Sequence, residues 1–234
     1  MHVRTSDRAG GTSTATEPAG GRRSTQADRS ARTRSALLAS AAQELSRYGY
    51  GNLILERVAS EAGYTRGALY HQFKDKEDLA LAVLEWVHEN WIREVGAPAA
   101  QEPDPVAELI ALARGHAVFC RRDVARVVMA LRVEFSGQDH PVGRAIARIS
   151  DGGAKRVARL INAGRRMGTI PPGPPARAVA LAFFGAMEGT VIQVAGRKPH
   201  DELLAARAVA GVLGLDPDAV PRATERRPDL DRRR

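Results

Sequence analysis

The chain contains little of what defines several specialised protein classes. It has one cysteine, Cys120, in 234 residues, which excludes a disulfide framework and any zinc site built from paired cysteines. Residues 1–34 contain no Leu, Ile, Phe or Trp, so we expect no secretory signal and a cytoplasmic protein. Aromatic residues make up only 5% of the chain. The remaining composition, 44% hydrophobic and 26% charged, is usual for a globular protein.

The net charge of +8 lies mainly at the two ends of the chain. Residues 1–34 carry seven Arg against three acidic side chains, and residues 221–234 carry six Arg against three. Because such Gly-, Ser- and Arg-rich segments bury little apolar surface, we expect a disordered basic arm over 1–32 and a disordered basic tail over 215–234. These segments are either simply solvated or in contact with a polyanion.

Between the ends, apolar residues recur at the three- and four-residue spacing of helices. No segment shows the alternation of a strand over more than a few residues, so the sequence predicts an all-α fold. The expected helices cover about 35–48, 55–62, 65–71, 75–95, 105–119, 123–135, 141–166, 178–195 and 202–213.

Proline, glycine and capping residues set the expected boundaries. Pro98, Pro103 and Pro105 predict a linker, with Asp104 as the N-cap of the helix that follows. Asp123 is the expected N-cap of the next helix. The pair Gly152-Gly153 is expected to weaken or kink the long helix around it. The proline-rich run 171–175 predicts a loop.

The segment from Ala178 to Ala195 is apolar on every side, apart from Glu188 and two uncharged polar residues. A membrane span is disfavoured because the run is short and rich in Ala and Gly, and because no second span exists. We expect instead that one side packs on its own domain and the other on a second copy of the chain. Gly185 and Gly189 would let that copy approach closely.

Two short helices joined at Gly63 predict a helix-turn-helix, whose second helix can enter a DNA major groove. The run from Val58 to Leu79, VASEAGYTRGALYHQFKDKEDL, closely resembles the DNA-binding region of TetR-family transcriptional regulators. The resemblance covers about residues 35–80, and beyond residue 90 it is only architectural. One departure is Ile54, where the family commonly has a Ser or Thr N-cap, so that helix start would rely on Asn52 or on water.

The resemblance implies a homodimer that binds an inverted-repeat operator in double-stranded DNA and senses a small molecule. It implies a DNA-binding domain over 33–80 and a ligand-binding and dimerisation domain over 81–214. Arg66 would read base edges, Lys74 would contact phosphate, and Arg29, Arg32 and Arg34 of the arm would assist. The DNA-binding residues that the resemblance implies are Arg57, Thr65, Arg66, Gly67, Ala68, Tyr70, His71 and Lys74.

The C-terminal half offers an apolar cavity between helices as the default small-molecule site. We expect no metal, no cofactor and no catalytic residue there. The ligand-binding candidates, each of which could equally be plain core, are Trp86, Trp91, His116, Phe119, Met129, Phe135, Phe183 and Met187. One helix, beginning at Asp75, would reach both the DNA-binding face and this cavity.

The favoured function is a repressor that an apolar or aromatic effector releases from DNA. The alternative is a helical enzyme or interaction module without sequence-specific DNA binding. His116 and Cys120 lie four residues apart and could pair a base with a thiol nucleophile, although a small buried cysteine is the ordinary interpretation.

Overall fold

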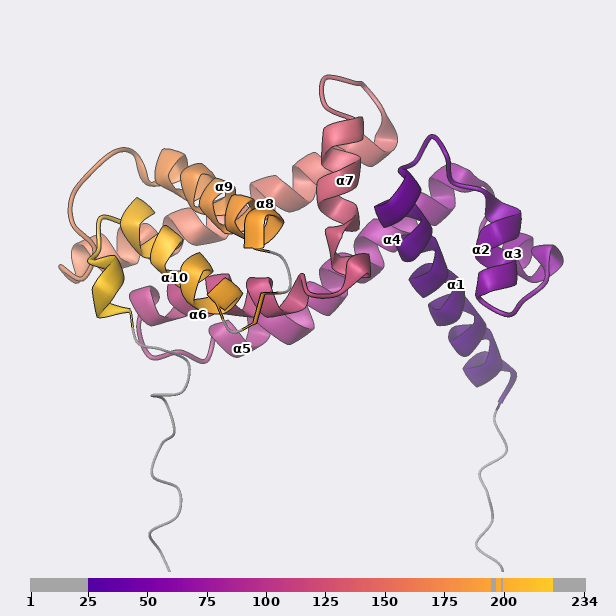
Figure 1. Ribbon diagram of the computed structural model, residues 1–234, viewed down its shortest axis with the longest axis horizontal. Helices are drawn as coiled ribbons and strands as arrows, with labels where there is room; N and C mark the ends of the chain where they lie inside the picture. Colours follow the sequence, from indigo (N-terminus) through magenta and orange to yellow (C-terminus); the bar gives the residue numbers. More distant parts are fainter. Residues whose placement is uncertain (1–24, 195–196, 199, 221–234) are drawn as a thin grey trace, which may run out of the picture.

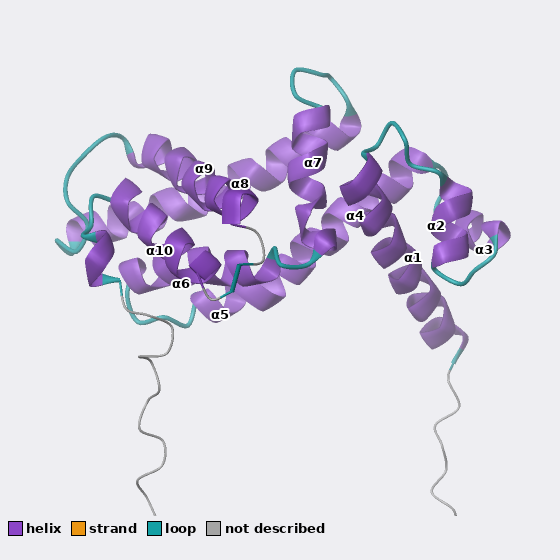
Figure 2. Cartoon of the chain, in the orientation of Figure 1, coloured by secondary structure: helices purple, strands orange, loops and turns teal. Residues whose placement is uncertain are grey.

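The computed structural model describes residues 25–194, 197–198 and 200–220, and this part of the chain is helical without any strand (Figure 2). The all-α prediction is confirmed. The helices are α1 (Gln26–Tyr48), α2 (Leu55–Glu61), α3 (Arg66–Gln72), α4 (Lys76–Trp91), α5 (Ala97–Ala99), α6 (Pro105–Phe119), α7 (Val127–Glu134), α8 (Pro141–Arg166), α9 (Ala176–Val194) and α10 (His200–Val212).

The helices form two lobes (Figure 1). The N-terminal lobe consists of α1, α2, α3 and the start of α4, and the C-terminal lobe contains α5 to α10. Helix α4 runs from one lobe into the other, and α7 lies between the lobes, packed on α1 and α8. In the N-terminal lobe, α1 packs on α2, α3 and α4. This packing buries Leu37, Leu45, Val58, Leu69 and Phe73 completely or nearly so.

Helix α1 begins nine residues earlier than the apolar pattern predicts. Thr25 and Asp28 form a capping box: the Asp28 N–H donates to Thr25 Oγ1 at 3.1 Å, and the Thr25 N–H donates to Asp28 Oδ2 at 2.9 Å. Extending an existing helix needs no new nucleus, so exposed polar residues can join it without apolar burial. The expected disordered arm is therefore wrong for residues 25–32, and residues 1–24 lie outside the described part.

The start of α2 lacks a side-chain cap among the described residues, because Ile54 occupies the N-cap position. Asn52 does not take over this role. Its Nδ2 group donates instead to the carbonyl of Tyr48, 3.1 Å away. The first turn of α2 is therefore held by packing, chiefly through the buried Val58 and Ala59.

The helical path beyond Trp91 continues past the expected boundary. A π-helical turn spans Ile92–Gly96, in which the Ala97 N–H donates to the carbonyl of Ile92, and α5 follows directly. Pro98 lies in the first turn of α5, where its missing N–H removes no necessary bond. The linker therefore begins only after Ala99. Asp104 caps α6 as expected, accepting from the N–H groups of Val106 and Ala107 at 2.9 Å.

The start of α7 also differs from the prediction. Asp123 is the first residue of a 3-10 turn, Asp123–Arg126, and not an N-cap. Its carboxylate pairs with Arg126 in the same turn and with Arg47 of α1. The short turn thus fixes the start of α7 against the N-terminal lobe.

Helix α8 is continuous through Gly152 and Gly153, so the expected weak point is not a break. A Cβ at Gly153 would come within 2.9 Å of the Phe184 ring. The glycine therefore provides room for an aromatic side chain of α9. At the C-terminal end, Pro217–Ala219 form a 3-10 turn and Val220 is buried. The expected tail is thus ordered over 215–220, and residues 221–234 lie outside the described part.

Candidate nucleic-acid interface and ligand cavity

Helices α2 and α3 form the helix-turn-helix. Gly63 has φ of +76°, a conformation that glycine adopts without strain, and the Tyr64 N–H donates to the Ala59 carbonyl at 2.9 Å. Thr65 caps α3 by accepting from the Ala68 N–H at 3.2 Å. Leu69 anchors α3 in the lobe with no exposed surface. The opposite face of α3 is therefore open to solvent.

Most of the DNA-binding candidates lie on this open face. Ala68 and Arg57 are only partly exposed. The exposed candidates are Thr65, Arg66, Gly67, Tyr70, His71 and Lys74. Small residues next to polar ones near the start of α3 leave the backbone accessible to a large partner.

Arg66 is held on the protein surface by two neighbours. Its Nε lies 3.0 Å from Glu56 Oε1 on α2, and its Nη2 donates to the Tyr70 hydroxyl at 3.4 Å. These contacts raise the pKa of Arg66 above its ordinary value, chiefly through the hydrogen bond to Tyr70 and then through the charge of Glu56. To read a base, Arg66 would have to break its ion pair with Glu56. Exposed ion pairs of this kind contribute at most about 1 kcal/mol to stability, so the cost of breaking it is small.

Arg57 faces inward more than the sequence suggests. Its Nε lies 2.6 Å from Oε1 of Glu44, which is only 1% exposed, and its guanidinium covers the Tyr48 ring at 4.6 Å. A buried carboxylate left without its partner is costly. In this arrangement Arg57 joins α1 to α2 and positions the motif, and it is not extended towards a partner.

Arg34 belongs to α1 and supports the far end of α3. Its Nη1 donates to the Gln72 carbonyl at 3.1 Å, and its guanidinium lies 4.5 Å from the centre of the Phe73 ring. This contact satisfies a carbonyl at the helix C-terminus, where no intrahelical donor remains. The cation therefore has a structural partner in the protein, a role that composition did not suggest.

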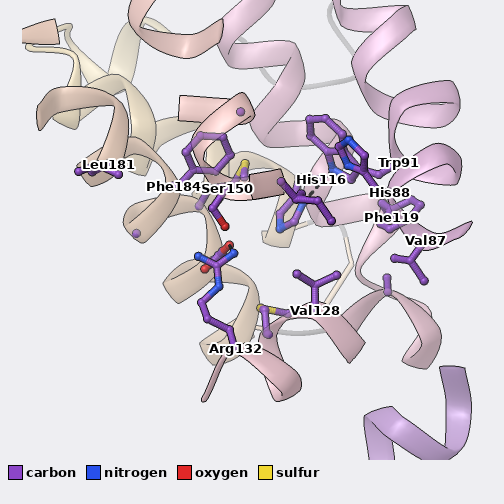
Figure 3. A pocket seen from close by; sticks show the side chains of 17 residues that line it. Val87, His88, Trp91, His116, Phe119, Val128, Arg132, Ser150, Leu181 and Phe184 are labelled. Carbon is purple, nitrogen blue, oxygen red and sulfur yellow. Dashed lines mark hydrogen bonds and ion pairs between the residues drawn. The ribbon is translucent and has the colours of Figure 1, made fainter. Parts of the chain in front are cut away.

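A cavity of about 290 Å³ lies in the C-terminal lobe, between α4, α6, α7, α8 and α9 (Figure 3). Five of the eight sequence candidates line it: Trp91, His116, Phe119, Met129 and Met187. The remaining wall is formed by Val87, His88, Ala125, Val128, Arg132, Ile149, Ser150, Gly153, Leu181, Phe184, Gly185 and Glu188. The wall is mostly apolar, with a few polar groups.

Three candidates lie elsewhere. Phe183 is fully buried and borders a smaller adjoining cavity of about 170 Å³, while its neighbour Phe184 borders both cavities. Trp86 lies in a groove with Arg93 and Arg122, on a different side of α4. Phe135 follows the last residue of α7 and stacks on His140, with ring centroids 4.4 Å apart. Neither Trp86 nor Phe135 borders the larger cavity.

His116 is a neutral hydrogen-bonded group of the cavity wall. Trp91 Nε1 donates to His116 Nδ1 at 3.1 Å, and Cys120 Sγ lies 3.4 Å from His116 Nε2. Burial lowers the pKa of His116 to about 4 and raises the pKa of the Cys120 thiol to about 12. A cysteine nucleophile needs a thiolate, so this pair is unsuited to nucleophilic catalysis near neutral pH.

The cavity also contains an ion pair that the sequence analysis missed. Arg132 Nη2, on α7, lies 3.2 Å from Glu188 Oε1, on α9 (Figure 3). Burial raises the pKa of Glu188, while Arg132 opposes this shift. Glu188 stands in an otherwise apolar stretch, and this isolation was the available signal. Nothing in the sequence alone placed Arg132 opposite it.

A second missed contact joins the cavity lobe to the N-terminal lobe. The Glu134 carboxylate, at the end of α7, accepts the N–H of Tyr50 at 2.6 Å and the N–H of Gly51 at 2.7 Å. The Tyr50 ring packs on Phe135 and His140, with centroids 5.2 and 5.3 Å away. Helix α7 thus borders the cavity and also binds the turn between α1 and α2.

The outer side of α9 is open in the single chain. Leu181 and Ile192 are 57% and 60% exposed, and apart from the adjacent backbone of α9 no described atom lies within 4 Å of a Cβ built at Gly185 or Gly189. Leu181 and Gly185 also line the cavity, so the open side of α9 adjoins it. By length and composition α9 is apolar enough to cross a membrane. However, its inner side packs on α8 and α10, and one such helix in this fold does not indicate a membrane protein.

The comparisons with known proteins agree with this geometry. Residues 37–83, which include the whole helix-turn-helix, match the family model "Bacterial regulatory proteins, tetR family". The N-terminal lobe is a TetR-family DNA-binding region. The chain is 40% identical over 68 residues to the HTH-type transcriptional regulator CymR of Pseudomonas putida, a match that covers 29% of the chain and 34% of CymR. The chain therefore matches about a third of the length of that curated relative.

Solved TetR-family structures extend the likeness to the whole fold. SCO4454 of Streptomyces coelicolor, a TetR-family regulator, is 23% identical, with a TM-score of 0.64 over 79% of this chain and 95% of that one. AibR, solved in complex with isovaleryl coenzyme A and operator DNA, is 20% identical, with a TM-score of 0.63 over 79% and 98%. At these identities the likeness concerns the TetR fold alone.

Proposed function

We propose that the protein is a homodimeric transcriptional repressor that binds an inverted-repeat operator and leaves it when a small apolar or aromatic effector fills the cavity. The observation that carries the proposal is the exposed face of α3, where Arg66 and Tyr70 flank small residues on a helix anchored by Leu69, with exposed Lys74 just beyond its end. Such a helix suits a major groove. The match to the TetR-family model supports the same assignment.

On this proposal the residues of α3 have separate tasks. Arg66 reads base edges, most favourably a guanine, because a guanidinium matches its two acceptors. Thr65 and Tyr70 contact phosphate and the adjacent sugar, and His71 lies against the backbone. Lys74 supplies a point charge that fixes register without reading sequence. Gly67 and Ala68 let the helix approach closely.

The dimer is proposed to form through α9 and α10. The open apolar side of α9 would be costly to leave in water, chiefly at Ile192 and Gly189, which lie beyond the part of α9 that lines the cavity. Leu204 of α10 is 41% exposed in the same way. A two-fold interface would bury these residues against their own copies. Two-fold symmetry then implies an inverted-repeat operator, with half-sites about one helical turn apart.

Two elements are proposed to carry the response from the cavity to the DNA-binding face. Helix α4 borders the cavity through Val87, His88 and Trp91, and its first turn packs in the N-terminal lobe through Leu79. Helix α7 borders the cavity through Arg132 and holds the 50–51 turn through Glu134. An effector that displaces either helix would change the separation of the two recognition helices in the dimer.

A selection of bound fragments from random or genomic DNA tests the function. We expect enrichment of one inverted-repeat sequence by the full chain, and loss of enrichment when Arg66 is changed to Ala. Enrichment without an inverted repeat would contradict the dimeric operator, and no enrichment would contradict sequence-specific binding. A Trp91→Ala variant should keep operator affinity and lose effector response, since Trp91 lies in the cavity and not on α3.

A further inference from the structure

The larger cavity has one charged pair in an otherwise uncharged wall. Among the described residues that line it, Arg132 and Glu188 are the ionisable groups that remain charged near neutral pH, because the pKa values of His88 and His116 are both lowered by burial. Arg132 is therefore the cation that an entering molecule meets. The rest of the wall that this molecule would contact is mostly apolar, with side chains such as Val128, Met129, Leu181 and Phe184.

Arg132 has hydrogen-bonding capacity that the protein does not use. A guanidinium carries five N–H donors. In the described part of the chain one contact, from Nη2 to Glu188, is present, and the buried Nε has no partner. A planar carboxylate can accept from two N–H groups of one guanidinium together, which is the strongest geometry available to arginine. The Arg132 side chain is 40% exposed, so a ligand can reach it.

The sign of the charge also favours an anion over a cation. An arginine does not lose its charge in a protein. If a ligand amine took Glu188, Arg132 would be left without a counter-ion in an apolar wall. If a ligand carboxylate takes Arg132, Glu188 can become neutral by binding a proton, and burial already raises its pKa. The pair can therefore be opened from the Arg132 side at lower cost.

We propose that the effector is an apolar or aromatic carboxylic acid whose carboxylate pairs with Arg132 in place of Glu188. The inference rests on the proposed function, because it assigns the effector site of the repressor. The ligand body would occupy the apolar wall beside Trp91 and Phe184. Its anionic end would separate α7 from α9, which the Arg132–Glu188 pair now joins, and α7 also carries Glu134.

Isothermal titration calorimetry on the full chain tests the ligand class without DNA. The probes are straight-chain carboxylates from hexanoate to dodecanoate, a cinnamate, and for each the amide and the amine of the same length. We expect at least one carboxylate to bind about tenfold or more tightly than its amide, since a charged hydrogen-bonded pair is lost in the amide. The amines should not bind.

Substitutions assign the contact. Arg132→Gln should reduce the preference for carboxylate over amide to about one, Arg132→Lys should keep part of it, and Glu188→Gln should increase carboxylate affinity by removing the competitor. Arg148→Gln is the matched control, because Arg148 is an exposed arginine of α8 that borders the adjoining cavity. Thermal melting of each variant identifies any that fail to fold. If Arg132→Gln does not fold, the carboxylate preference of Arg132→Lys is compared with that of the original protein instead.

Several results would overturn the assignment: equal binding of carboxylates and amides, a preference for amines, binding by no member of the series, or a carboxylate preference that Arg148→Gln abolishes and Arg132→Gln leaves intact. Tighter binding of octanoyl coenzyme A than of octanoate would also overturn it. Operator binding without any probe is measured on the same preparation. Absence of operator binding would refute the proposed repressor function. The ligand preference measured by calorimetry would remain valid in that case, because it is measured without DNA.

Discussion

Gly49 and Glu134 lie so close together that a side chain at position 49 would collide with the carboxylate: a Cβ there would come within 2.7 Å of Glu134 Oε2. Gly49 ends α1 with φ of +73° and ψ of 177°, a conformation that is almost restricted to glycine. The residue therefore serves two purposes. It ends the helix, and it lets a carboxylate of α7 reach the N–H groups of Tyr50 and Gly51.

Gly49→Ala should lower the free energy of unfolding by more than backbone strain alone would. The strain itself is on the order of 1–3 kcal/mol, and displacement of Glu134 from its two N–H donors adds a loss of similar size. In a Glu134→Ala background the cost of Gly49→Ala should be smaller by about 1 kcal/mol or more. Urea unfolding of the four proteins of this double-mutant cycle measures the difference.

Gly63→Ala is the control for that cycle. Gly63 also has a positive φ, of +76°, but no described atom lies within 4 Å of a Cβ built there. Its cost should therefore be the same with and without Glu134. Additive costs for Gly49→Ala and Glu134→Ala would contradict the proposed contact between the two residues.

Operator affinity should respond differently to substitutions at three charged residues. Lys74→Ala should weaken binding to all sequences alike and reduce the salt dependence by about one unit of slope. Arg66→Ala should relax preference at one base pair in each half-site, at a cost of roughly 1–3 kcal/mol. Glu56→Gln should strengthen binding, because Glu56 holds Arg66 on the surface and repels phosphate. Fluorescence anisotropy across a salt series measures all three.

The assignment of roles depends on which variant changes sequence preference. If Lys74→Ala altered preference and left the salt slope unchanged, the two roles would be reversed. Weaker binding by Glu56→Gln would show that Glu56 supports α3 and does not restrain Arg66.

Gly189→Trp should produce monomers that bind operator poorly. Gly189 lies on the open side of α9 beside exposed Ile192, with no described atom near its Cβ position, so the single chain can accommodate the larger residue. A dimer formed by close approach of two α9 helices cannot. Gly152→Trp is the control, because Gly152 is an exposed helical glycine with similar open space on α8. Light scattering measures the oligomeric state of both variants. A Gly189→Trp protein that remains dimeric would show that the interface lies elsewhere.

Stability should fall as the pH is lowered from about 6.5 to about 4. The folded-state pKa of His116 is about 4, against an ordinary value of 6.5, so between these values the unfolded chain binds more protons than the folded chain. One group of this kind lowers the unfolding free energy by about 1.4 kcal/mol per pH unit in that window. His88, whose pKa is also lowered, acts in the same direction.

His116→Gln should reduce this pH dependence, because an amide can still accept from Trp91 but does not titrate. Urea unfolding of both proteins across the window measures the change in slope. Equal slopes would show that His116 is hydrated and charges freely in the folded protein.

The local features of the N-terminal lobe follow from the sequence because their causes are local. Thr65 caps α3 through a residue three positions away, and Gly63 supplies the turn with its own backbone freedom. The bounds of α8 were predictable for the same reason, since proline starts the helix. The early start of α1 was missed because its cap, Thr25 with Asp28, lies well before Leu37, the first residue of the apolar stripe.

The tertiary structure decided which distant side chains meet. Arg132 and Glu188 are 56 positions apart, Glu134 and Tyr50 are 84 apart, and neither spacing carries a sequence signal. Phe135 and Trp86 have the same aromatic character as Trp91, and only the side of the packed chain on which each residue lies puts Trp91 in the cavity and the other two outside. Helical periodicity determines that a helix has an apolar side, but the packing of several helices determines what that side encloses, because an ion pair or a cavity needs groups from separate elements to converge in space.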